Sequence, residues 1–147
     1  MKSVAIVGAG IAGLSAAWAL TKRGIAVTLY EQAETIPNPL SASGDEHRII
    51  RRAYGHQSGY ARRIDSAYEA WESMFEDLGA NHLISNGFLL VSRTPGDEAE
   101  RYRDGLLEGG YPLEMMSDGQ AADRFAFLEP GTFRYAAFGP EGGALMC

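Results

Sequence analysis

The stretch that decides the fold is SVAIVGAGIAGLSAAWALTKR at residues 3–23. Ser3 to Val7 is a short, partly β-branched apolar run bounded by glycine, which is typical of a strand buried on both faces. The turn GAGIAG follows at residues 8–13, and residues 14–23 have the composition of a helix. Residues 26–30 form a second apolar run. The order strand, turn, helix, strand predicts an α/β protein with a Rossmann-type layer.

The glycine turn carries the pattern of a dinucleotide-binding loop. Gly8 permits a tight turn, Gly10 lets a pyrophosphate approach the backbone, and Gly13 lets helix and strand pack closely. The helix N-terminus offers free N–H groups and positive potential to phosphates. Glu31 stands 18 residues after Gly13, where its carboxylate can accept hydrogen bonds from ribose hydroxyls and repels the 2′-phosphate of NADP. A phosphate-free glycine turn is the weaker alternative, and the motif leaves FAD and NAD both open.

Composition excludes several classes of function. The 147 residues hold 13 Lys and Arg against 19 Asp and Glu, a net charge of −6, which disfavours nucleic-acid and anionic-membrane partners. Cys147 cannot form an internal disulfide, and no His/Cys cluster has metal-ligand spacing, so we expect no metal site and a cytoplasmic protein. The uncharged stretch Val4 to Leu20 resembles a signal peptide, but its three closely spaced glycines favour the strand, turn and helix instead.

A second motif, SASGDEHRIIRRAYG, spans Ser41 to Gly55 after a proline- and serine-rich loop. From the spacing alone it is the basic start of a solvated helix. Together with VAIVGAGIAGLSAAWAL at residues 4–20 and Glu31, however, it resembles the FAD-dependent amine and amino-acid oxidases of the D-amino-acid oxidase superfamily. The resemblance is greatest to the monomeric sarcosine oxidase and N-methyltryptophan oxidase branch. It covers this whole chain but only the N-terminal portion of the family's length.

The resemblance implies FAD as the cofactor and a small amino acid or amine as the substrate. It implies that Ser41 to Arg51 runs beside the flavin, with Arg48 against the isoalloxazine and Arg51 paired with the substrate carboxylate. Guanidinium suits this role because its rigid fork of donors matches a carboxylate bidentately. Arg52 is expected to be a surface charge. The expected catalytic residues are Arg48 and Arg51, and the expected cofactor-binding residues are Gly8, Gly10, Ile11, Ala12, Gly13, Glu31, Gln32, Ser41, Ser43, Arg48 and Ile49.

Hydrophobic periodicity and turn signals divide the rest of the chain. The predicted elements are a helix over 58–78 that ends at Gly79, a β-hairpin of 82–84 with 88–92, a helix over 95–108, a strand over 111–115, a helix from a Ser117 cap to Arg124, and a strand over 133–138. The helix over 58–78 carries an aromatic stripe that predicts core packing.

These elements predict a domain order and a function. Residues 1–81 form an incomplete FAD-binding layer, 82–138 begin an antiparallel substrate-binding layer, and 139–147 return toward the first. Since the family's third parallel strand follows later in its sequence, we expect a C-terminal partner polypeptide to complete the fold. The predicted activity is oxidation of an α-amino acid or secondary amine by hydride transfer from Cα–H to flavin N5, giving an imine. The alternatives are a flavin monooxygenase of the aromatic hydroxylase type and a non-catalytic nucleotide-binding subunit.

Overall fold

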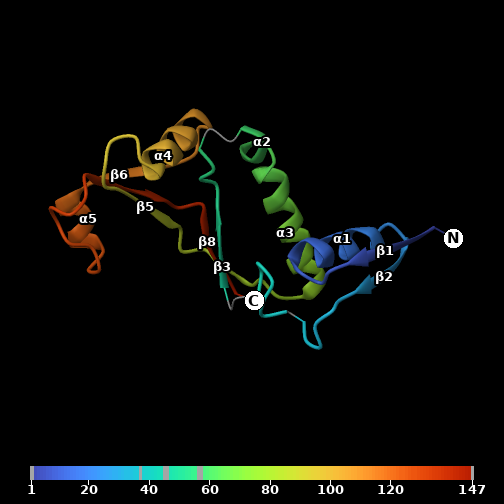
Figure 1. The fold of residues 1–147 in the computed structure, drawn as a ribbon. Helices are drawn as coiled ribbons and strands as arrows, with labels where there is room; N and C mark the ends of the chain where they lie inside the picture. Colours follow the sequence, from blue (N-terminus) through green and yellow to red (C-terminus); the bar gives the residue numbers. More distant parts are fainter. Residues whose placement is uncertain (1, 37, 45–46, 56–57, 147) are drawn as a thin grey trace. The chain divides into compact units, whose positions relative to one another are not determined.

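The computed structural model describes residues 2–36, 38–44, 47–55 and 58–146. The chain divides into two compact units, Met1–Arg48 and Ile49–Met146, and Figure 1 traces both along the chain. This structural boundary lies well before the sequence-based division at residue 81. The functional division into an FAD-binding and a substrate-binding layer stays a prediction.

The first unit is a β–α–β motif. β1 (Ser3–Val7) leads through the glycine turn into α1 (Ile11–Thr21), and β2 (Ala26–Tyr30) follows. β1 and β2 pair in parallel from Ser3↔Ala26 to Val7↔Tyr30, as the sequence predicts. The helix starts three residues before its predicted start at Leu14, because Gly10 is the N-cap and the turn is correspondingly short.

β1 is more exposed than its apolar sequence predicts. Only β2 pairs with it in the described part of the chain, and most of its residues are exposed. Val7 is 88 % exposed and Tyr30 of β2 is 58 % exposed. The expectation of a strand buried on both faces is therefore wrong for these residues, since one helix and one neighbouring strand cannot cover both faces.

The second unit holds two small sheets and four helices among the residues described. Their bounds are β3 (His47–Arg51), which starts at the unit boundary, α2 (Ser58–Ala61), α3 (Ile64–Leu78), β4 (Leu83–Ile84), β5 (Phe88–Ser92), α4 (Glu98–Glu108), β6 (Glu114–Ser117), α5 (Asp118–Arg124), β7 (Tyr135–Gly139) and β8 (Gly142–Met146). One sheet has the order β3-β8-β4 and the other β5-β7-β6. None of the described helices combines the length and apolar character that crossing a bilayer requires.

Residues 83–92 and 135–145 form a bent antiparallel ribbon, which corrects the predicted hairpin. β4 pairs with β8 and β5 pairs with β7, so β4 and β5 lie in different sheets. Residues 85–87 are the bend between them: Gly87 has φ +75°, and its N–H donates to the Gly142 carbonyl at 3.0 Å. A turn signal between two apolar runs therefore marks a change of sheet here.

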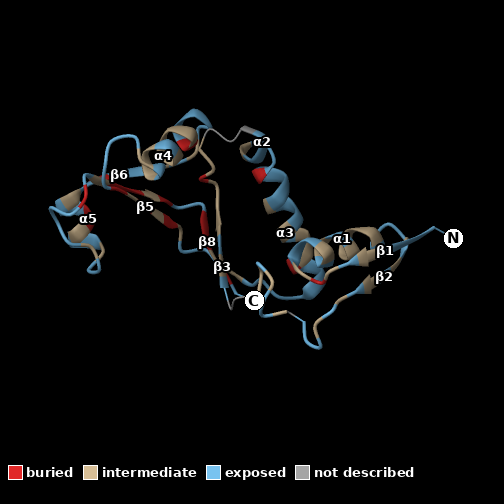
Figure 2. Cartoon of the chain, in the orientation of Figure 1, coloured by how far each residue is buried: buried red, intermediate tan, exposed pale blue. Residues whose placement is uncertain are grey.

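The β5-β7-β6 sheet is covered on both faces. Alternate residues of β5 point to opposite sides: Phe88 and Leu90 pack with Leu106 of α4, whereas Leu89 and Val91 pack with the cluster around Met116. Figure 2 shows the buried segments concentrated along these strands. This period of two is what a strand between two apolar layers requires.

The predicted helix over 58–78 is two helices, α2 and α3, separated by a turn at residues 62–63. The Arg63 N–H donates to the Tyr60 carbonyl at 2.9 Å in this turn. The predicted end is confirmed, because Gly79 adopts φ +70° and closes α3. Ile64 and Phe75 of α3 are buried, which confirms that part of its apolar stripe packs in the core.

Arg52 is not the surface charge that the sequence predicts. Its side chain is only 16 % exposed and forms ion pairs with Asp65 of α3 and Glu141 of the β7–β8 connection. Its guanidinium carbon lies 4.5 Å from the ring centre of Tyr68 and 4.9 Å from that of Tyr111. One largely covered cation therefore connects the chain after β3 to three other segments. A run of arginines cannot reveal this, since the partners are distant in sequence.

The loop before α4 is organised by one carboxylate. Asp97 is the N-cap of α4 and accepts hydrogen bonds from the N–H groups of Glu100, Arg93 and Thr94 at 2.9, 2.7 and 3.2 Å. Its Oδ1 also lies 3.2 Å from the donating hydroxyl of Ser92, which is fully buried. These donors, the Glu100 N–H first, lower the pKa of Asp97 from 3.8 to about 2.

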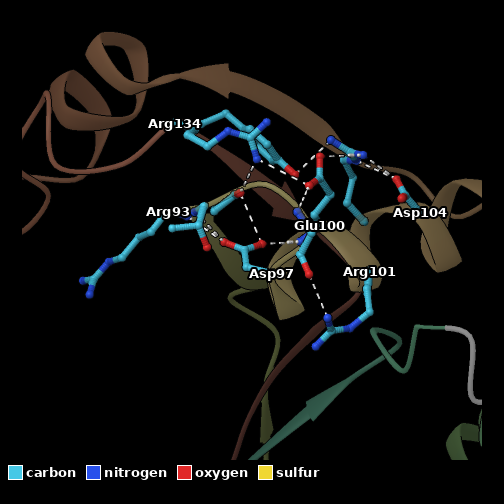
Figure 3. Close-up of polar contacts among 11 residues, drawn as sticks. Arg93, Asp97, Glu100, Arg101, Asp104 and Arg134 are labelled. Atoms are coloured by element: carbon cyan, nitrogen blue, oxygen red, sulfur yellow. Dashed lines mark hydrogen bonds and ion pairs between the residues drawn. The ribbon is translucent and has the colours of Figure 1, made fainter.

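Arg134 extends this network to the chain before β7, as Figure 3 shows. Its Nη1 lies 3.3 Å from the Ser92 hydroxyl and 3.4 Å from Glu100, which also pairs with Arg103 at 3.4 Å. α4, β5 and the segment leading into β7 are thereby joined by polar contacts at one end of the sheet.

We predict that Asp97→Asn lowers the melting temperature of the intact protein by roughly 3 °C at neutral pH, because Asn loses the charge and one acceptor of the cap. Since the folded pKa of Asp97 is depressed, its contribution is present above pH 3.8 and is lost as the pH falls toward about 2. The melting temperature of the variant should accordingly decline less over that range. Asp123→Asn, at an exposed position in α5, is the matched control. Equal acid sensitivity of all three proteins would contradict the assignment.

Candidate functional site

The turn between β1 and α1 brings the helix closer to the strand than a side chain allows. A Cβ atom added to Gly13 would lie 1.9 Å from the carbonyl oxygen of Gly8. Gly8 has φ +101°, and its N–H donates to the Tyr30 carbonyl at 2.7 Å. Glycine is therefore required at position 13 by space and favoured at position 8 by backbone conformation.

The N-terminus of α1 presents open hydrogen-bond donors. Its N-cap, Gly10, has no side chain to close it. The Ile11 N–H donates to the Ser43 hydroxyl at 3.1 Å. No acceptor for the N–H groups of Ala12 and Gly13 is found among the described residues. Unpaired donors at the positive end of a helix dipole fit the phosphates of a dinucleotide.

Glu31 holds the glycine turn from the end of β2. Its Oε2 accepts from the Ala9 N–H at 2.7 Å, while Oε1 accepts from the N–H groups of Gln32 and Ala33 at 3.0 Å each and from the Asn38 amide at 3.3 Å. These donors, that of Ala9 first, lower the pKa of Glu31. Oε2 accepts from one donor among the described residues and can accept a further hydrogen bond. The hydrogen bond that the sequence analysis expects from a ribose hydroxyl to Glu31 stays a prediction. Gln32 contributes its backbone to this cluster.

Asn38 is a site residue that sequence reasoning missed. Besides its bond to Glu31, its Oδ1 accepts from the Leu40 N–H at 2.9 Å and its carbonyl from the Ser41 N–H at 2.9 Å. A Cβ on Gly44 would lie 2.5 Å from that carbonyl. The available signal is an asparagine between two prolines, a residue type that bonds to its own backbone in turns. Asn38 thus shapes the loop that carries Ser41 and Ser43.

The segment of residues 41–48 contributes hydroxyls and one cation to the first unit. The Ser41 and Ser43 hydroxyls lie 3.4 Å apart. The Arg48 guanidinium donates to the carbonyl of Ala42 and, at 3.2 Å, to that of His47. Its charge is therefore anchored on the backbone of this loop. The structure brings Ser43 to the N-terminus of α1. The expected contacts of Ser43 with the cofactor and of Arg48 with a flavin stay predictions.

Ile49 and Arg51 belong to the second unit. Ile49 is 68 % exposed. The guanidinium carbon of Arg51 lies 4.7 Å from the ring centre of Tyr102 of α4. None of the carboxylates that the structure describes forms an ion pair with Arg51, whereas adjacent Arg52 pairs with two. Tyr102 is a second residue that the sequence analysis missed, because its contact depends on how α4 packs.

The cluster in the first unit meets the chemical requirements of FAD. The absence of a side chain at Gly13 leaves open the space that a Cβ would fill. The first turn of α1 supplies donors for a pyrophosphate, and Glu31 supplies an acceptor for a ribose hydroxyl. Within the described ranges, no three side chains of His, Cys, Asp or Glu form a group that could hold a metal ion.

Comparison with known proteins identifies the family. Residues 3–147 match the profile of the DAO family, described as FAD dependent oxidoreductase. The chain is 27 % identical over 147 residues to monomeric sarcosine oxidase from Bacillus sp. strain NS-129, covering 97 % of this chain and 37 % of that protein. It is 37 % identical over 126 residues to the tRNA 5-methylaminomethyl-2-thiouridine biosynthesis bifunctional protein MnmC from Acinetobacter baylyi strain ATCC 33305, covering 78 % of this chain and 19 % of that protein.

A solved structure gives the same result for the fold. NikD, described as an unusual amino acid oxidase essential for nikkomycin biosynthesis, superposes with a TM-score of 0.80 at 21 % identity over 99 % of this chain and 38 % of that chain. The overlap confirms the predicted α/β, Rossmann-type fold. The chain spans well under half the length of each of these proteins. Because the family profile matches almost all of the sequence and the glycine turn keeps the dinucleotide geometry, the chain belongs to the family of FAD-dependent oxidoreductases.

Proposed function

We propose that this chain supplies the FAD-binding turn and the carboxylate-binding arginine of an enzyme that oxidises an α-amino acid or secondary amine. The reaction moves a hydride from the substrate Cα–H to flavin N5 and leaves an imine. The observation that carries the proposal is Arg51, a guanidinium with no carboxylate partner among the described residues, one position before an arginine that has two. The names of the relatives agree with this class, since they include a sarcosine oxidase and an amino acid oxidase.

FAD, when bound, supplies the acceptor for the hydride, and the protein supplies positioning and electrostatics. The donors at the start of α1 hold the pyrophosphate, and Glu31 accepts from the adenosine ribose. Ser41, Ser43 and Ile49 are proposed to border the cofactor, and Arg48 to add positive charge near the flavin ring. Such charge favours the anionic product of reduction.

Arg51 binds and orients the substrate in this proposal. Its planar fork grips a carboxylate through two parallel hydrogen bonds, which fixes the direction of the neighbouring Cα–H. An amine without a carboxylate lacks that grip. The proposed substrate class is therefore a small molecule in which the oxidised C–N bond adjoins a carboxylate.

We also infer that further polypeptide covers the exposed apolar surface of the first unit. Val7 and Tyr30 are largely exposed on a two-stranded sheet, and the matched share of the relatives leaves most of their length without a counterpart here. Mass spectrometry of the native particle distinguishes a separate chain from a longer chain that contains these residues.

We predict that Gly13→Ala lowers the affinity for FAD by roughly tenfold or more, since the added Cβ would lie 1.9 Å from the Gly8 carbonyl oxygen and overpacking of this kind costs about 1–3 kcal/mol. Titration of the apoprotein with FAD, followed by flavin fluorescence, measures the change. Gly119→Ala is the matched control, because a Cβ there meets nothing within 4 Å. An FAD affinity of the Gly13→Ala variant equal to that of the wild type would contradict the proposed role of the glycine turn in FAD binding.

We predict that Arg51→Gln weakens binding of carboxylate substrates by about 2 kcal/mol or more, because a charged, bidentate partner is lost. A panel of α-amino acids that includes sarcosine, each compared with its amide, measures KM in the holoenzyme. The loss should fall on the acids and spare the amides. Arg63→Gln, at an exposed arginine before α3, controls for charge. An unchanged KM for every acid would refute the carboxylate clamp.

A further inference from the structure

Tyr102 is the aromatic partner of Arg51. It lies in the first half of α4, and the guanidinium carbon of Arg51 lies 4.7 Å from its ring centre. Aromatic faces attract guanidinium groups through their quadrupole, and the attraction strengthens as water is excluded. The contact therefore restricts where the Arg51 side chain can lie.

The Tyr102 ring is itself held on two sides. Its hydroxyl donates to the Glu98 carboxylate one helical turn earlier. A Cβ on Gly55 would lie 3.2 Å from Cδ1 of Tyr102, and one on Gly105 would lie 2.7 Å from the Gly55 carbonyl oxygen. The chain after β3 thus rests directly on α4: a Cβ at Gly105 would clash with the Gly55 backbone, and one at Gly55 would require the Tyr102 ring to shift slightly.

Arg51 and Tyr102 border an open hollow of about 390 Å³. Glu98 and the β5 residues Leu90 and Val91 also line it. There is space beside the guanidinium for a small molecule, and one wall of that space is apolar. An ordinary packing contact between an arginine and a tyrosine needs no such space, so the hollow is an observation independent of the ring contact.

We propose that Tyr102, held by Glu98, is a positioning residue for Arg51 that keeps its guanidinium at the hollow for a substrate carboxylate. The inference rests on the proposed function, because it assumes that Arg51 binds the carboxylate. Contact with a neutral tyrosine leaves the charge of the guanidinium without a carboxylate partner, whereas an ion pair would compensate it. Adjacent Arg52 shows the alternative, since its cation is matched by Asp65 and Glu141.

Glu98 has a separate role in this arrangement. The hydrogen bond from the Tyr102 hydroxyl to the Glu98 carboxylate raises the pKa of Tyr102, so its side chain stays neutral over the physiological range. A phenolate would attract Arg51 more strongly and compete with the substrate. Glu98 also lies in the first turn of α4, where negative charge is favoured by the helix dipole.

The test compares carboxylate and amide binding in the FAD-loaded holoenzyme. Acetate and acetamide are titrated as unreactive probes, with the change in the visible flavin spectrum or heat as the readout, and KM and kcat are measured with sarcosine and its amide. We expect Tyr102→Leu to weaken acetate binding and to raise the sarcosine KM by about three- to tenfold while kcat at saturation is kept. Acetamide and the amide substrate should be unaffected, and Tyr102→Phe should restore binding to within about twofold of wild type.

Controls separate positioning from folding. Tyr135→Leu removes the ring beside Arg103 on the same helix and should leave acetate binding unchanged. If Tyr102→Leu does not fold, Tyr102→Met fills similar space without an aromatic face and must show the same acid-specific loss. Equal losses for acetate and acetamide, or no loss in either variant, would overturn the inference.

A different result would contradict the proposed function itself. If Arg51→Lys leaves acetate binding unchanged, the carboxylate clamp is wrong, and the positioning role falls with it. If Arg51→Lys weakens acetate binding but Tyr102→Leu and Tyr102→Met do not, only the positioning role is wrong.

Discussion

The close approach of α1 to the Gly8 carbonyl is the constraint on which the proposed cofactor site depends. Without a Cβ at Gly13, the first turn of α1 can lie directly behind the β1 turn, and the N–H groups of Ala12 and Gly13 have no acceptor among the described residues. The Glu31 carboxylate fixes the same turn from β2 through the Ala9 N–H. A side chain at position 13 would push the helix away and misalign its donors, so the geometry and the anion site have one physical origin.

The loop of residues 38–44 adds hydrogen bonds to the glycine turn. Asn38 connects Glu31 to the loop backbone, and Ser43 accepts from the first N–H of α1. Residues that are more than twenty positions apart therefore share one network. The Glu31 carboxylate accepts from four neutral N–H donors, which favour its charged form and lower its pKa.

The sequence predicts the local elements better than their partners. The turns and helix ends marked by local sequence signals lie where expected, because each depends on neighbours within a few residues. They include the glycine turn, the Ser117 N-cap and the end of α3 at Gly79. The β4–β5 hairpin was wrong because strand partners are chosen by the whole sheet, and the turn at Gly87 is equally suited to a bend. The sequence does not reveal the contacts of Arg52 and Tyr102 for the same reason, since each contacts residues more than forty positions away, Glu141 for Arg52 and Arg51 for Tyr102.

Arg51 and Arg52 are neighbouring, chemically identical residues whose surroundings differ. Arg52 lies between two tyrosine rings and two carboxylates, so its charge is compensated within the protein. Arg51 meets one neutral ring, whose attraction for a cation is much weaker than that of a carboxylate. A partly buried guanidinium in that state gains more from an incoming anion than a paired one, because no existing ion pair has to be broken first. The charge of Arg52 is compensated by two carboxylates and that of Arg51 by none among the described residues, and this difference is the physical reason to propose substrate binding for Arg51 and a structural role for Arg52.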